Sequence, residues 1–176
     1  MELYYSSRDT ERLSDNLSLL KRADGMGGEV AIDRFYIFNS KFKKTNIIKF
    51  GETFHIEISV RGFASMEDLQ MVVGIDSIMG ERIATTIHAK DLSFELNKDE
   101  VAVGKVFLKE YFVPGTYNIT LAVRQHKNIL VDKLKSIGTL VIEPVVDDSC
   151  IDEVYLPGGY FHLQKAKWTI EKNIGV

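Results

Sequence analysis

The fold class is decided by the stretch Pro114-Gly115-Thr116-Tyr117-Asn118-Ile119-Thr120-Leu121-Ala122-Val123-Arg124. The Pro-Gly pair at its start is typical of a turn, and the residues after it alternate between apolar and polar side chains. Alternation with a period of two predicts a β-strand that buries one face and exposes the other. The exposed face of this strand would carry Asn118, Thr120 and Arg124.

The same period of two recurs on both sides of this stretch, and turn signals separate the runs. The further predicted strands are residues 30–38, 54–60, 71–75, 82–88, 101–108, 129–134 and 138–146, with turns at 77–80 and at Lys127-Asn128. About eight or nine short strands without a convincing long helix predict an all-β fold. We expect an immunoglobulin-like or jelly-roll antiparallel β-sandwich.

Composition limits the functional classes. The chain has 176 residues, a formal net charge of −3 and a single cysteine, Cys150. Proteins that bind nucleic acids or membrane surfaces usually carry a basic excess, so we expect neither partner. A lone cysteine cannot form a disulfide within the chain, which fits a reducing compartment. We therefore expect a cytoplasmic location.

The first 27 residues differ from the rest of the chain. Leu13, Leu17, Leu19 and Leu20 recur at roughly helical spacing, and the glycine-rich stretch 24–28 breaks any helix. We predict an N-terminal arm or linker over residues 1–27 and a sandwich with a C-terminal tail over residues 28–176. The arm would either fray as a terminus or dock on a partner subunit or an upstream domain.

Signals for catalysis are scarce. The glycines at the arm's end precede no lysine-serine pair, so there is no phosphate-binding loop. The four histidines lie too far apart for zinc spacing, and Cys150 has no partner motif. We expect no cofactor, no metal and no catalytic residue, hence no enzyme. A glycosidase stays an open alternative, since its two carboxylates are paired in space rather than in sequence.

The polar faces of the alternating strands suggest a different chemistry. Sugars are bound by apolar or aromatic surfaces that cover the ring face, together with planar polar groups that hydrogen-bond the hydroxyls. Outward-facing side chains of the predicted strands could supply those polar groups if their strands are neighbours in one sheet. The predicted carbohydrate-binding residues are Asp76, Arg82, Thr86, His88, Asn118, Thr120 and Arg124.

A series of local motifs carries a family resemblance. In order, the motifs are Gly27–Ile32, Phe50–Ile56, Val73–Asp76 followed by a turn and Ala84–Thr86, and Val113–Val123. Each motif recurs in many sandwich domains, but their order and separations together resemble one family. The series is similar to the C-terminal domain of the ATP-binding subunit of O-antigen ABC exporters, the Wzt type.

The resemblance implies a non-catalytic domain that binds finished O-polysaccharide, often at a modified non-reducing end, and so gates its export. It also implies a homodimer whose partners are an upstream nucleotide-binding domain and the membrane subunit of the exporter. That nucleotide-binding half is absent from this sequence, so we expect it on a longer or a separate chain. No sugar-contact motif of the family can be transferred to this sequence, and the site prediction therefore rests on strand alternation.

Two other readings remain open. The first is a general interaction module that binds protein instead of sugar, and it would show a contiguous apolar patch on the exposed sheet. The second is a glycan-processing enzyme, and it would require two carboxyl groups about 5–10 Å apart in a cleft.

Overall fold

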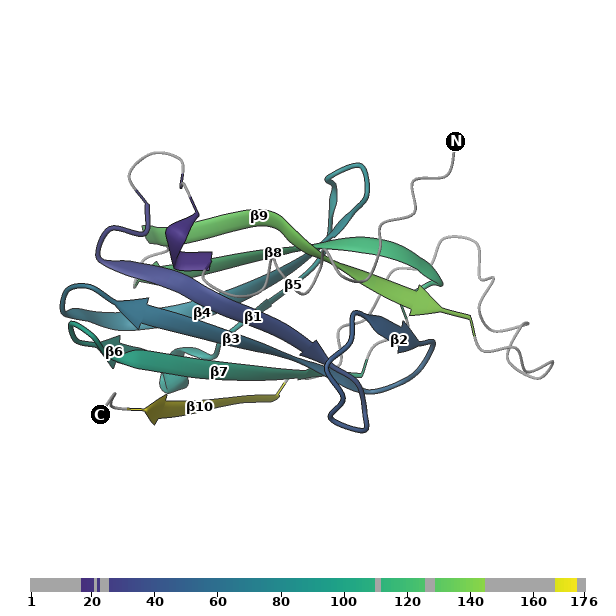
Figure 1. The fold of residues 1–176 in the computed structure, drawn as a ribbon, viewed down its shortest axis with the longest axis horizontal. Helices are drawn as coiled ribbons and strands as arrows, with labels where there is room; N and C mark the ends of the chain where they lie inside the picture. Colours follow the sequence, from purple (N-terminus) through teal and green to yellow (C-terminus); the bar gives the residue numbers. More distant parts are fainter. Residues whose placement is uncertain are drawn as a thin grey trace.

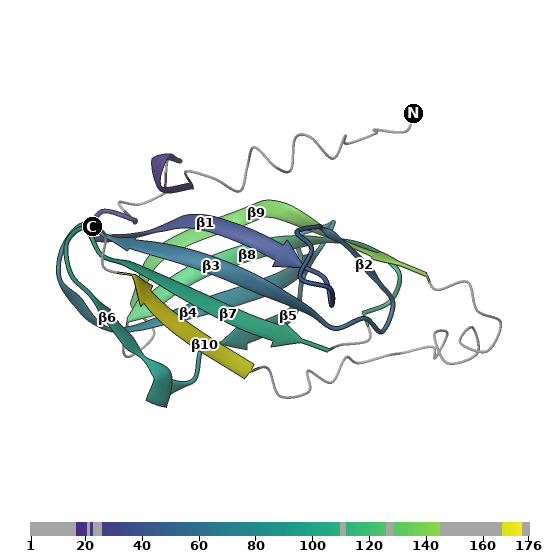
Figure 2. The same ribbon diagram turned by 60° about the horizontal axis from the view of Figure 1, so that its bottom comes forward.

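The structure of this protein is a computed structural model that describes residues 17–20, 22, 26–109, 112–125, 129–144 and 167–173. Most of the predicted arm, the Lys127-Asn128 turn, Cys150 and most of the tail lie outside these residues. Two β-sheets face each other as the layers of a sandwich (Figures 1 and 2). No described helix is both long enough and apolar enough to cross a membrane.

The four-stranded sheet is entirely antiparallel. Its strand order is β1-β3-β7-β10, with β1 at Val30–Phe38, β3 at Phe54–Gly62, β7 at Val101–Leu108 and β10 at Lys167–Asn173. In β3, buried side chains such as Ile56 and Ile58 alternate with half-buried Glu57 and Ser59. This is the pattern of a strand with one face in the core.

The six-stranded sheet forms the second layer. Its order is β2-β9-β8-β4-β5, with β6 also paired to β4. All neighbours are antiparallel except β2 and β9, which run parallel. The strands are β2 (Ile47–Lys49), β4 (Met66–Ser77), β5 (Arg82–Ile87), β6 (Phe94–Leu96), β8 (Gly115–Gln125) and β9 (Ile129–Glu143); η1 (Leu17–Leu19) and η2 (Lys90–Leu92) are short 3₁₀ helices.

The predicted β-sandwich is confirmed, with differences in its strands. The two strands predicted at residues 129–134 and 138–146 are one strand, β9, which runs to Glu143 and has an irregularity around Ser136, whose φ is 51°. Residues 145 and 146 lie outside the described residues. Three strands were not predicted. β2 and β6 have only three residues each, too few for an alternating pattern to be recognised in the sequence, and β10 lies in the tail. The described residues thus contain ten strands.

The core lies between the sheets and is filled by one side of each strand. Val73 on β4, Leu121 on β8 and Ile56 on β3 are fully buried there. At the start of β8 the hydroxyl of Tyr117 donates a hydrogen bond to the carbonyl oxygen of Val113 at 2.6 Å. A tyrosine bonded to backbone a few residues upstream is a feature of immunoglobulin-like sandwiches.

The segment around η1 is bound to the sandwich by a buried ion pair. Arg22 donates two parallel hydrogen bonds of 3.0 Å to the carboxylate of Asp132 on β9. The side chains of Arg22 and Asp132 are 4% and 0% exposed. The same carboxylate accepts hydrogen bonds from the backbone N–H of Ile32 and of Lys133. With Leu17 also buried, this part of the predicted arm packs as part of the fold.

Candidate functional site

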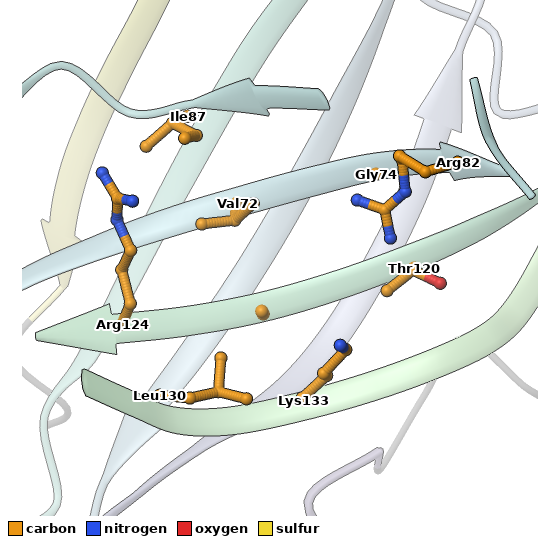
Figure 3. A pocket seen from close by; sticks show the side chains of 9 residues that line it. Val72, Gly74, Arg82, Ile87, Thr120, Arg124, Leu130 and Lys133 are labelled. Atoms are coloured by element: carbon orange, nitrogen blue, oxygen red, sulfur yellow. The ribbon is translucent and has the colours of Figure 1, made fainter. Parts of the chain in front are cut away.

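The outer face of the six-stranded sheet contains a hollow of about 310 Å³. This size is at the lower end of the range for small-molecule sites. Residues from β4, β5, β8 and β9 point into it (Figure 3). We call this hollow the groove; it is lined by Val72, Gly74, Arg82, Ile87, Thr120, Ala122, Arg124, Leu130 and Lys133.

The floor of the groove is apolar. Val72 on β4 and Ala122 on β8 are paired across the two strands. Each of them alternates with core residues of its own strand, so the groove lies on the face opposite the core. Ile87 and Leu130, which are 40% and 38% exposed, flank the floor on β5 and β9. Such a surface can cover the apolar face of a sugar ring.

Arg82 spans one end of the groove. Its guanidinium extends over β4 towards Thr120 on β8 (Figure 3). It donates one hydrogen bond to a carboxylate oxygen of Asp76 and another, of 3.0 Å, to the Thr85 hydroxyl. The other carboxylate oxygen of Asp76 accepts a 2.6 Å hydrogen bond from Thr120. Asp76 is thereby covered and bonded at both oxygens, while the Arg82 side chain stays 40% exposed.

A glycine makes room for this arginine. A Cβ atom added to Gly74 would lie 2.1 Å from Nη1 and 2.2 Å from Cζ of Arg82. No side chain at this position could share the space with the guanidinium where it now lies. The absence of a side chain at Gly74 therefore allows the guanidinium of Arg82 to lie close to the β4 backbone.

Arg124 stands at the other end of the groove and is held by a buried amide. Its Nε donates to Oε1 of Gln70 at 3.1 Å. The Nε2 of Gln70 in turn donates to the backbone carbonyl of His88 at 2.9 Å. Because Gln70 is buried and bonded on both sides, it fixes the guanidinium of Arg124 relative to the floor.

Lys133 completes the lining from β9. Lys133 pairs with Ala122 and so shares its outer face, whereas the preceding residue, Asp132, pairs with the core residue Val123 and holds Arg22. Two consecutive residues of β9 thus face opposite ways, Asp132 towards the interior and Lys133 into the groove.

The structure brings together most of the predicted site residues. Arg82, Thr120 and Arg124 line the groove, and Asp76 lies beneath Arg82. Asn118 is paired with Asp76 on the same face but lies outside the lining, where its side chain donates a 3.4 Å hydrogen bond to the carbonyl of Ser77. None of these placements tests sugar binding, which stays a prediction.

The expected outward orientation of Thr86 and His88 is wrong. Thr86 pairs with the core residue Val73, and His88 is 1% exposed, with its ring 6.1 Å from that of Phe94. The reason is a bulge near the β4–β5 turn. Arg82 and Ala84 are two positions apart on β5, but their partners on β4, Asp76 and Ile75, are consecutive residues. An extra residue reverses the alternation that follows it.

Six groove residues were not predicted: Val72, Gly74, Ile87, Ala122, Leu130 and Lys133. Val72, Ile87 and Ala122 are apolar and Gly74 has no side chain, so a search for outward-facing polar residues does not find them. Leu130 and Lys133 are three residues apart and would not share a face in a regular strand. An irregularity between β8 and β9 places both on the outer side, opposite Arg124 and Ala122.

A second hollow of about 290 Å³ adjoins the groove and shares Leu130 with it. Its lining comes from the start of β4, the ends of the β8–β9 pair and the segment before β1. Polar side chains here are Glu29 and Gln125. Two adjoining hollows give a chain-like ligand room to extend beyond one unit.

Two described histidines, His88 and His55, have a lowered pKa. Burial lowers the pKa of His88, although Asp91 acts in the opposite direction. Burial likewise lowers the pKa of His55 on the opposite sheet, where its ring stacks 4.7 Å from Phe38. Among the described residues, no three His, Cys, Asp or Glu side chains gather in a way that could hold a metal ion.

Comparison with known proteins agrees with this architecture. The family model of the Wzt C-terminal domain matches residues 25–151, more than half of the chain. The chain belongs to the Wzt C-terminal domain family. The crystal structure of the C-terminal domain of Wzt matches with a TM-score of 0.62 at 12% identity, over 68% of this chain and 76% of that chain. At this identity, the likeness shows the shared Wzt-type fold alone.

Two further solved structures match parts of the Wzt-type sandwich more loosely. One is a calcium-binding mutant of Bacteroides uniformis β-glucuronidase 2, with a TM-score of 0.44 at 14% identity over 58% of this chain and 12% of that one. The other is a Listeria innocua β-glucosidase in complex with gluconolactone, with a TM-score of 0.37 at 12% identity over 62% and 16%. No curated protein matches the chain.

Proposed function

We propose that this chain is a non-catalytic carbohydrate-binding domain that recognises O-antigen polysaccharide, through its non-reducing terminal region, for export by an ABC transporter. Membership of the Wzt C-terminal domain family supports a carbohydrate-binding role in O-antigen export. The observation that carries the assignment to a site is the groove, in which an apolar floor is bordered by Arg82, Thr120 and Arg124.

The composition of the groove suits a sugar ring. Val72 and Ala122 can contact the C–H face of a pyranose, while two guanidinium groups donate to its hydroxyls and ring oxygen. The hollow is shallow and open to water, so the net free energy of binding is small. We expect a Kd of about 10⁻⁴ to 10⁻⁶ M for one site.

Coupling to the transporter would run through β9 in this proposal. Lys133 lines the groove, and the adjacent Asp132 holds Arg22 of the segment that precedes β1. In Wzt-type subunits the ATP-binding half lies on this N-terminal side. A cytoplasmic location and a homodimer belong to the same proposal, because two sites per dimer would raise the avidity for a polymer.

The test is calorimetric titration of the purified chain with O-polysaccharides from several serotypes, including that of the source strain. Saturable binding of the cognate polymer is expected. Ala122→Trp fills the floor and should abolish binding. Ser59→Trp introduces the same side chain on the outer face of the four-stranded sheet and should leave binding unchanged.

Two results would contradict the proposed function or its site. If no polymer binds while urea unfolding shows an intact fold, the carbohydrate assignment is overturned and the protein-interaction reading takes its place. If Ala122→Trp binds as well as the unsubstituted chain, the sugar site lies elsewhere on the surface.

A further inference from the structure

Positive charge is concentrated in the groove. Three of its lining side chains are cationic, Arg82, Arg124 and Lys133, and none of its described lining residues is acidic. The whole chain has a formal charge of −3, so this concentration is not a consequence of its composition. A cluster of one sign in a hollow with apolar walls raises the local potential and favours ligands of the opposite charge.

The carboxylate beneath Arg82 is already engaged by its neighbours. Asp76 accepts from Arg82 at one oxygen and from Thr120 at the other, and it is only 6% exposed. Both oxygens of Asp76 are therefore engaged before any ligand arrives. Lys133 takes part in no ion pair between described residues.

The arginines are also fixed in position. Gly74 lets the Arg82 guanidinium lie close over β4, and Asp76 and Thr85 hold it there. Gln70 holds Arg124 through its Nε. A planar guanidinium that is positioned in advance loses little side-chain entropy on binding and matches carboxylate and phosphate oxygens.

From this geometry we infer that the groove recognises a glycan that carries an anionic group, a carboxylate or a phosphate, on the sugar that occupies it. This inference rests on the proposed function and names the class of polysaccharide for the same site. The sugar ring covers Val72 and Ala122, and its anionic substituent lies among Arg82, Arg124 and Lys133. A neutral sugar would accept hydrogen bonds from the guanidinium groups but would form no ion pair with them.

The experiment compares three forms of the O-polysaccharide of the source strain by calorimetry. They are the native polymer, the polymer with its carboxyl groups reduced to alcohols, and the polymer dephosphorylated with hydrofluoric acid. We expect one of the two treatments to weaken binding by about tenfold or more, because a charge-assisted hydrogen bond is lost. The treatment that does so identifies the anion. Binding of the native polymer should also weaken as salt is raised.

Charge-removing variants add an independent measurement. Arg124→Gln and Lys133→Gln should each weaken binding of the native polymer by about three- to tenfold. They should have little effect on the polymer that has lost its anion. Lys135→Gln is the matched control, since Lys135 is exposed on the same strand but outside the lining.

The outcomes separate the inference from the proposed function. Equal binding of the native and both treated polymers, without dependence on salt, overturns the anionic inference and leaves the carbohydrate site intact. Failure of all three polymers to bind a folded chain overturns both together.

Discussion

Two arginine–aspartate pairs in this protein have the same chemistry and different surroundings. Arg22 and Asp132 join the N-terminal segment to β9, with side chains 4% and 0% exposed. Arg82 and Asp76 lie on the outer face of the six-stranded sheet, with side chains 40% and 9% exposed. The first aspartate accepts four hydrogen bonds, two from its arginine and two from backbone N–H groups.

The difference separates a structural arginine from one that the proposed function assigns to binding. Arg22 gives its remaining donors to the carbonyl oxygens of Leu17, Leu20 and Ile32, so its hydrogen bonds stay within the chain. Arg82 instead presents an exposed edge to the groove while Asp76 fixes its other edge. Loss of the buried pair should cost stability, and loss of the exposed pair should cost affinity.

The largest expected effect is on stability and comes from Arg22→Met. This change keeps the aliphatic stem but leaves the buried carboxylate of Asp132 without its cation. We expect the free energy of unfolding to fall by about 3–5 kcal/mol, measured by urea denaturation. Arg34→Met is the control, because Arg34 is 52% exposed and lies 3.6 Å from Asp33. It should cost about 0–1 kcal/mol. Equal losses in the two variants would contradict the distinction.

A double-mutant cycle at Gly74 and Arg82 should show a smaller effect. Gly74→Ala places a methyl group where the Arg82 guanidinium now lies, and the arginine must leave Asp76. In an Arg82→Ala background the same methyl group meets no guanidinium. We expect a coupling energy of about 0.5–3 kcal/mol by urea denaturation. Additive single substitutions would show that Arg82 has an equally stable alternative position.

Gln70→Leu tests the support of Arg124 at the other end of the groove. The change removes the acceptor for Arg124 Nε and the donor to the His88 carbonyl, and it should cost about 1 kcal/mol of stability. Affinity for the polysaccharide should fall by a few-fold, because Arg124 is no longer fixed. Gln125→Leu, whose amide bonds the exposed Glu67 carbonyl, should change both quantities less. Reversal of that order would remove the positioning role of Gln70.

A gradual pH dependence is the mildest expected effect. Burial lowers the pKa of His88 and of His55 from the ordinary value of 6.5, so the folded state favours the neutral rings. The unfolded chain takes up protons first as pH falls, and stability that is fully present above pH 6.5 declines below it. Urea denaturation at about pH 7.5 and 5.5 measures this decline. His88→Leu should reduce the difference between the two pH values; an unchanged difference would exclude His88 as its source.

The sequence predicted the fold because alternation is a direct consequence of burying one face. In β8 the core side chains from Tyr117 to Val123 occupy every second position, and the same rule places Thr120 and Arg124 on the opposite face, where Thr120 is nevertheless only 4% exposed. Irregularities in pairing are not visible in this pattern. Extra residues at the β4–β5 turn and in β9 put Thr86 on the core side and Leu130 beside Arg124. Register is a property of two strands, and one strand's sequence does not contain it.

The alternation in β4 and β8 also makes this protein a candidate scaffold for directed evolution. Positions 72 and 122 form the groove floor and positions 87 and 130 flank it, while positions 71, 73, 121 and 123 are buried in the core. A library confined to the groove positions would vary the surface of the groove without changing the core packing that stabilises the sandwich. On the proposed function, selection from such a library would retarget the groove to other glycans, with the Arg22–Asp132 pair left intact in every member.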